Sequence, residues 1–539
     1  MDEPKNIPAQ SATDFFRFNP PEWLARSTIF LMILPSMLLL GISVASINAA
    51  AGYYGISPSD AQYSMIVFYA ALASFFPFEK RLFYYFPSKT YFFICVIIQI
   101  IMSWICFETT SFPVLLICRF IQGLANCGTI SVCITMIFSR LHTERSREIG
   151  YSVFYGILLC ITPITTMFTA PMLDNSNYVV IYKAVMFTYI PGSLLLLILM
   201  KNLRLAKKLP LYQLDLPGFV LYATALCSIG FVLIYGQERY WFSDKYIRLA
   251  TIAVVILLVM CYMRTSKLRR PILNLGVFKF RNFYVGMFLV MMLYLCRGAF
   301  GISSQYFAGT LGMDPLNICE VLVWNIAGII FGILISSRLV IQLVPMRLIW
   351  MAGFALLLVY HIWMCFLITT QADQGTFYIP FIVQGMGAGM LLAPLILFMI
   401  SSVPAQMSQT ASAIGVFVRY TSFCISIALI NYFQLKDVNT HYDRLQQEVT
   451  ATNPVAVDRL KIYQQNMASK GLPADLSAKI ANVQLSKAMK AQSELRFYLD
   501  YYQMISYLLA GLLIILSFIP YINRTKVKVI YSQPAAVSY

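Results

Sequence analysis

The chain has 539 residues, of which 59% are hydrophobic and only 12% are charged, and its mean hydropathy is +0.70. This composition excludes a water-soluble globular domain. In a soluble protein the net charge of +17 would suggest a nucleic-acid partner. In a membrane protein, lysine and arginine in loops set the topology beside anionic lipid, so no nucleic acid is expected.

Apolar runs of about 20 residues recur along the chain, and each can cross a hydrocarbon core of about 30 Å. They predict an all-α, polytopic membrane protein with fourteen spans through the lipid bilayer. The expected spans are 27–50, 62–79, 90–107, 113–138, 150–171, 180–200, 215–236, 246–263, 283–306, 318–337, 347–368, 377–400, 411–434 and 499–521.

The basic residues predict an orientation for these spans. With the N-terminus inside, the cytoplasmic segments hold 24 Lys and Arg residues, whereas the short external loops and span edges hold 4. An excess of this kind marks cytoplasmic loops. Both tails, 1–26 and 522–539, are therefore expected in the cytoplasm, with the protein in the inner (plasma) membrane.

The predicted span 113–138 contains a permanently charged residue, Arg119, followed by Gln122 and Gly123. An arginine surrounded by hydrocarbon costs roughly 2.5 kcal/mol or more, so it normally faces a protein interior or a wet cavity. This helix is expected to line the site of transport.

Two features of the first half recur in the second half, about 260 residues later. Residues 120–125 read FIQGLA and residues 382–387 read IVQGMG, and a basic hairpin at 81–89 is matched by one at 338–347. Duplicated halves predict a two-lobed transporter that binds substrate between its lobes, although chance similarity between apolar segments is an alternative. The predicted parts are a tail 1–26, a six-helix lobe 27–200, two additional spans 215–263, a basic amphipathic linker 264–282, a six-helix lobe 283–521 and a tail 522–539.

The segment 435–498 is the only sizeable polar region between predicted spans. Asn453-Pro454 is typical of a helix start, and Gly471 to Pro473 is typical of a stop. These signals predict an external helical hairpin whose second arm continues into the last span. The hairpin is interpreted as a solvated lid, a gate over the exit or a dock for a partner.

Several short motifs, in this order along almost the whole chain, are similar to one transporter family. They are Asn48, Arg119 to Gly123, the runs 189–192, 215–219, 236–243 and 271–283, Arg419, and the long loop before the last span. Together they resemble the fourteen-span drug:proton antiporter branch of the major facilitator superfamily, of the EmrB/QacA type and most closely EmrB.

The resemblance implies a major facilitator fold, alternating access, and export of amphipathic small molecules driven by proton entry. It also implies a periplasmic adaptor protein, here at the loop 435–498, and a tripartite efflux pump. Some family motifs are degenerate: Tyr84, Tyr85 and Pro87 replace the charged loop motif, Ser43 replaces an acid, and Thr166 stands where the family has a glycine. The family's proton route therefore does not transfer to this chain.

A proton-driven transporter needs a group that titrates within the membrane. The ion-coupling candidates are Glu320, which Arg297 at a similar depth could pair with, and then Asp500 and His361. The alternatives are a static ion pair or a solvated acid for Glu320, a packed histidine for His361, and a helix cap for Asp500.

The cavity and substrate candidates are Asn48, Arg119, Gln122 and Arg419. Arginines outnumber acids within the spans. A cavity with this positive charge would prefer anionic amphiphiles as substrates, unless each arginine is neutralised locally. The 12 cysteines lack metal-ligand spacing, and no phosphate loop or catalytic pairing is recognisable, so neither metal, cofactor nor enzyme activity is expected. Two alternatives to drug export remain: a carrier for one anionic or lipid-like metabolite, and a non-transporting sensor or assembly scaffold.

Overall fold

The computed structural model describes residues 16–17, 20–140, 146–204, 214–268, 271, 273–450 and 452–518. Within these residues the chain is helical, apart from loops and one isolated bridge between Phe16 and Met200. Fourteen helical segments are long and apolar enough to cross a membrane, which confirms the predicted number. Most of the two predicted tails, 1–26 and 522–539, lies outside the described residues.

The first group of helices, called the N-terminal bundle here, contains the first six spans. Its helices are α1 (Glu22–Ala45), α2 (Ile47–Tyr54), α3 (Pro58–Tyr85), α4 (Ser88–Glu108), α5 (Phe112–Arg140), α6 (Ser146–Leu159), α7 (Ile161–Asn175) and α8 (Val180–Leu199). The start of α3 shows why the chain turns here. Ser57 and Asp60 form a reciprocal capping box, and Pro58 occupies the first turn, where its missing N–H costs nothing.

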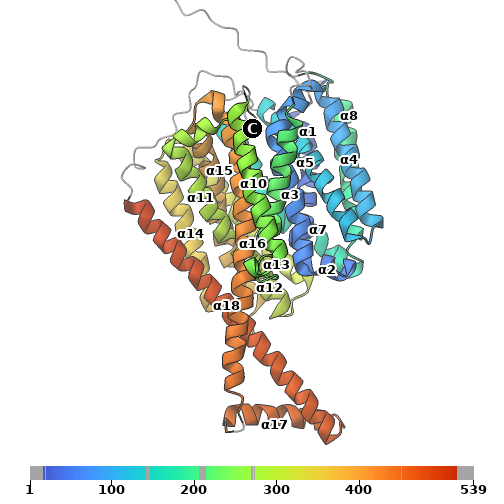
Figure 1. Ribbon diagram of the computed structural model, residues 1–539, viewed down its shortest axis with the longest axis vertical. Helices are drawn as coiled ribbons and strands as arrows, with labels where there is room; N and C mark the ends of the chain where they lie inside the picture. Colours follow the sequence, from blue (N-terminus) through green and yellow to red (C-terminus); the bar gives the residue numbers. More distant parts are fainter. Residues whose placement is uncertain are drawn as a thin grey trace, which may run out of the picture.

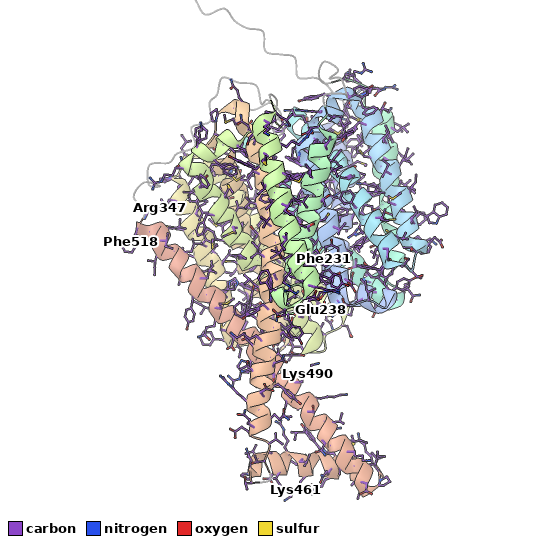
Figure 2. The ribbon with its side chains drawn as sticks, viewed as in Figure 1. Phe231, Glu238, Arg347, Lys461, Lys490 and Phe518 are labelled. Atoms are coloured by element: carbon purple, nitrogen blue, oxygen red, sulfur yellow. The ribbon has the colours of Figure 1, made fainter. Side chains whose placement is uncertain are left out.

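The second group, called the C-terminal bundle here, contains the last six spans. Its helices are α11 (Arg281–Arg297), α12 (Ala299–Gly309), α13 (Pro315–Ile341), α14 (Met346–Leu367), α15 (Tyr378–Ser401), α16 (Ser408–Gln447) and α18 (Ala474–Phe518). The end of α18 lies beside the start of α14, where the Arg347 guanidinium donates to the Ser517 carbonyl (Figure 2). A cation at a helix C-terminus satisfies a carbonyl that has no partner within the helix.

Helices α9 (Leu216–Tyr235) and α10 (Lys245–Lys267) are the two additional spans, and α9 packs against both bundles. The Tyr235 hydroxyl donates to Asp60 Oδ1 of α3 at 2.5 Å, and the Tyr420 hydroxyl of α16 donates to the Leu226 carbonyl at 2.7 Å. In contrast, α10 packs on α9 and leaves most of its apolar surface exposed, as a lipid-facing helix does.

Three of the predicted continuous spans are interrupted. The first breaks at Ser46, where the backbone leaves the helical region (φ −144°, ψ 42°) and α2 begins. The fifth breaks at Cys160 between α6 and α7, and the ninth breaks at Gly298 between α11 and α12. Pro163 contributes to the second break because proline cannot donate the helical hydrogen bond to the residue four before it.

The segment after the thirteenth span forms a triangular frame that projects from the bundles (Figure 1). The helix α16 continues to Gln447, α17 spans Pro454–Ala468, and α18 returns without interruption into the last span. The predicted start of α17 is confirmed, since Asn453 accepts a hydrogen bond from the Val455 N–H and Pro454 follows it. Lys461 and Lys490 lie on this frame (Figure 2).

The duplicated Gln-Gly motif occupies matching places in the two bundles. A Cβ at Gly123 of α5 would lie 2.3 Å from the Phe68 carbonyl oxygen of α3. A Cβ at Gly385 of α15 would lie 2.3 Å from the Asn325 carbonyl oxygen of α13. In each copy the missing side chain therefore allows two helix backbones to touch, which is the usual role of small residues in membrane helix packing.

Candidate functional site

The break between α6 and α7 lies close to the break between α11 and α12, across the boundary between the bundles. Because Pro163 has no N–H, the Leu159 carbonyl at the end of α6 lacks its normal helical donor. Arg297, the last residue of α11, donates from Nη2 to this carbonyl at 3.4 Å. A charged donor from the C-terminal bundle thus satisfies a backbone acceptor of the N-terminal bundle.

Arg419 of α16 lies near the same boundary and is 8% exposed. Its Nε donates to the Gly415 carbonyl at 3.3 Å, and its guanidinium lies 5.3 Å from the ring centre of Tyr155 on α6. Tyr69 of α3 and Tyr294 of α11 are close enough to interact electrostatically with the same guanidinium. Tyrosine faces and hydroxyls stabilise the charge without neutralising it.

These five residues, Tyr69, Tyr155, Tyr294, Arg297 and Arg419, are called the interbundle cluster. They come from α3, α6, α11 and α16, so both bundles contribute to it. Among the described residues, neither arginine forms an ion pair. The cluster therefore carries two positive charges at a place that two moving bundles share.

Arg119 and Gln122 lie elsewhere, inside the N-terminal bundle, and both are fully buried. Arg119 Nη1 donates to the Leu39 carbonyl of α1 at 3.1 Å and to Gln122 Oε1 at 3.3 Å. The guanidinium also lies 4.8 Å from the Phe68 ring centre. These contacts join α1, α3 and α5, so in this structure Arg119 holds one bundle together, and the interbundle boundary is lined by other residues.

Asn48 is on α2, beyond the break at Ser46, and its side chain is exposed. The sequence placed it inside a continuous first span, but the helix is interrupted two residues earlier. Asn48 shares no hydrogen bond with Arg119 or with a residue of the interbundle cluster among the described contacts, and its contact with substrate stays a prediction.

The expected pairing of Glu320 with Arg297 is wrong, because each side chain has a different partner. Glu320 is exposed, and its Oε1 accepts a hydrogen bond from the Tyr378 hydroxyl of α15 at 2.6 Å. Arg297 instead reaches Leu159 in the other bundle. The carboxylate of Glu320 and the guanidinium of Arg297 thus belong to separate parts of the molecule.

The remaining candidates, His361 and Asp500, also have local partners. His361 is fully buried in the C-terminal bundle, where its Nδ1 lies 2.6 Å from the Leu357 carbonyl oxygen and its ring lies beside Tyr360 and Tyr502. Asp500 Oδ2 lies 2.7 Å from His441 Nε2, so it joins α18 to α16. Asp500 is therefore a cross-helix contact, and the predicted helix cap is wrong because α18 starts at Ala474.

Sequence reasoning overlooked one buried acid, Glu79. It is 2% exposed on α3 and accepts a hydrogen bond at Oε2 from the Ser131 hydroxyl of α5 at 2.7 Å. The span was expected to end at residue 79, whereas α3 continues to Tyr85. The aromatic run after Glu79, which includes Phe83, was the signal that the helix extends further.

Comparison with known proteins supports the same architecture. The chain is 23% identical to the probable multidrug resistance protein EmrY of Escherichia coli (strain K12) over 451 residues, which cover 80% of this chain and 84% of that protein. It is also 23% identical to the multidrug export protein EmrB of the same strain over 447 residues, with the same coverage. These identities make it a distant relative of both proteins.

Solved structures share the fold at low identity. A crystal structure of the peptide transporter POT superposes with a TM-score of 0.58 and 12% identity, over 94% of this chain and 96% of that one. The family model of the Major Facilitator Superfamily matches residues 29–427, well over half of the chain. The chain therefore belongs to the Major Facilitator Superfamily, and it is a multi-pass secondary transporter rather than an enzyme.

Proposed function

We propose that this protein exports amphipathic small molecules from the cytoplasm across the inner membrane by alternating access, driven by proton entry. The observation that carries the proposal is the interbundle cluster, in which two arginines of the C-terminal bundle meet aromatic rings of both bundles. Aromatic surfaces accommodate the apolar part of such a substrate, and the boundary between the bundles is where alternating access requires it to bind. The distant relationship to EmrB and EmrY supports export.

A second candidate function is transport of one anionic or lipid-like metabolite. It is favoured by the charge of the cluster, because Arg297 and Arg419 form no ion pair with a described residue. A guanidinium that keeps its charge in low-dielectric surroundings attracts a carboxylate or sulfonate strongly. The same charge disfavours the cationic dyes that many drug pumps carry.

Reconstitution separates these functions. Full-length protein in liposomes would receive an imposed pH gradient, and uptake of a quaternary ammonium dye would be compared with uptake of a fluorescent fatty-acid-like carboxylate. We expect gradient-driven movement, with the carboxylate preferred and Arg419→Gln reducing that preference. Arg26→Gln is the matched control, since Arg26 is exposed at the start of α1 and pairs with Glu22.

Each outcome has a definite meaning. Movement that ignores the gradient would contradict proton coupling, and preference for the cationic dye would contradict an anion site. No movement of any amphiphile would favour the scaffold alternative.

We also propose that the frame of α16, α17 and α18 lies outside the cytoplasm and docks a periplasmic adaptor protein, as the inner-membrane part of a tripartite pump. Its support is the shape of the frame, which projects beyond the bundles with charged residues along it (Figure 2). The test is co-purification of an adaptor with the full chain and with a variant that lacks residues 448–473. Equal recovery of the adaptor from both would contradict the proposal.

A further inference from the structure

The carboxyl group of Glu79 is buried in the N-terminal bundle, and its hydrogen bonding is incomplete. Its Oε2 accepts from Ser131, whereas its Oε1 has no hydrogen-bond partner among the described residues. It forms no ion pair with a described residue either. A carboxyl group that is removed from water and forms no ion pair binds a proton more readily than an exposed carboxyl group does.

Titratable groups on three helices lie close enough to Glu79 to interact with it electrostatically. They are Lys80 and Tyr84 on α3 itself, Tyr91 and Cys95 on α4, and Cys127 on α5. The one cation, Lys80, directs its Nζ over the ring of Tyr84 at 5.7 Å. The surroundings of Glu79 are therefore composed mainly of hydroxyl and thiol groups.

A row of buried polar side chains leads from Glu79 along the contact between α4 and α5. Gln99 Nε2 of α4 donates to Asn126 Oδ1 of α5 at 3.1 Å, and Gln122 Nε2 of α5 donates to Ser103 Oγ of α4 at 3.0 Å. All four side chains are fully buried. With Tyr91, the α4 members lie eight and four residues apart, so they occupy one face of the helix.

This row, called the polar track, contains unsatisfied atoms. Among the described residues, no hydrogen bond of normal geometry reaches the Tyr91 hydroxyl, Gln99 Oε1, Asn126 Nδ2 or Glu79 Oε1, and the Tyr91 hydroxyl lies close enough to Glu79 to interact with it electrostatically. Gly128 of α5 allows the Tyr91 side chain of α4 to pack directly against the α5 backbone, since a Cβ there would lie 2.7 Å from the Tyr91 hydroxyl. Buried polar atoms without protein partners are normally satisfied by ordered water, which several atoms in a row can hold.

We propose that Glu79 is a proton-binding site of this transporter, reached through a hydrated polar track formed by Tyr91, Gln99 and Asn126. On binding, the proton joins Oε1 and the carboxylate becomes a neutral acid, while Ser131 continues to donate to Oε2. On release the proton returns to a water of the track, and no other bond changes. This inference rests on the proposed proton-coupled transport, because it assigns the group that carries the proton.

The first test needs no substrate. Infrared difference spectra of the purified full-length protein, recorded between acidic and alkaline pH, detect carboxyl groups that gain or lose a proton. We expect a titrating carboxylic-acid band in the wild type that is absent in Glu79→Gln and present in Glu108→Gln, whose acid is exposed at the end of α4. A band that survives Glu79→Gln, or a Glu79 band that does not change with pH, would overturn the proposal.

The second test measures two kinds of movement of a carboxylate amphiphile in liposomes: uptake driven by a pH gradient, and exchange without a gradient. In Glu79→Gln we expect gradient-driven uptake to fall about tenfold or more, because a positioned proton-transfer group contributes roughly 10²–10⁴-fold. Substrate exchange without a gradient should stay near the wild-type rate. The double variant Gln99→Leu with Asn126→Leu, which removes the track, should reproduce this pattern.

Equal loss of both modes in a folded Glu79→Gln protein would show a structural role and overturn the proposal. So would unchanged gradient-driven uptake. If the wild type itself ignores the gradient, the proposed function fails, and the infrared test still decides whether Glu79 binds a titrating proton.

Discussion

Replacement of Gly385 by alanine tests how the C-terminal bundle is held together. The new Cβ would lie 2.3 Å from the Asn325 carbonyl oxygen and 2.8 Å from the Ile329 nitrogen, both backbone atoms of α13. Restoring ordinary contact requires the two helices to separate by about 1 Å, and overpacking of this kind costs about 1–3 kcal/mol. Alanine recovers only about 0.5–1 kcal/mol through its better helix propensity.

The assay is thermal unfolding of the purified protein in detergent. The matched control is Gly511→Ala in α18, where a Cβ meets nothing within 4 Å, so only the gain in helix propensity remains. We expect Gly385→Ala to unfold at a lower temperature than wild type and Gly511→Ala at the same or a higher temperature. Equal stability of the two variants would refute the argument that Gly385 permits backbone contact.

Three further predictions follow from single contacts. Arg297→Met leaves the buried Leu159 carbonyl without its donor, at a cost of about 1–3 kcal/mol. The contact between α6 and α11 should therefore weaken, and spin-label distances between the bundles should increase; an unchanged distribution would contradict this. Asp500→Asn removes a half-exposed pair with His441 and should lower the free energy of unfolding by less than about 1 kcal/mol, whereas a larger loss would indicate a further role. Gly128→Ala should push the α4 side chains out of the contact with α5 and destabilise the protein by about 1–3 kcal/mol; a wild-type melting temperature would show that α4 adapts freely.

Much of the architecture was predictable because it depends on short stretches of sequence. The number of spans follows from runs of apolar residues, each of which must cover the same thickness of hydrocarbon. The start of α17 at Pro454 follows from local capping chemistry around Asn453. Each copy of the repeated motif holds a glycine, Gly123 or Gly385, and both positions touch the backbone of a neighbouring helix.

The candidate site was less predictable because it depends on which faces of distant helices meet. Arg297 was expected to pair with Glu320, which lies at a similar depth in the predicted spans, but it contacts a carbonyl 138 residues away that a break and a proline leave free. Glu79 was overlooked because its burial depends on how far α3 extends and on α4 and α5 closing around it.

The sequence by itself therefore determined that this protein is a membrane protein with fourteen spans and that it resembles a family of transporters. Hydrophobicity and helix capping are local properties, so they can be read without knowing the fold. Only the tertiary structure decided that Arg297 and Arg419 meet tyrosines of both bundles and that Arg119 is enclosed within one. The partner of a charged side chain is set by long-range packing, since in a low-dielectric interior each charge must be satisfied by whatever neighbour the fold supplies.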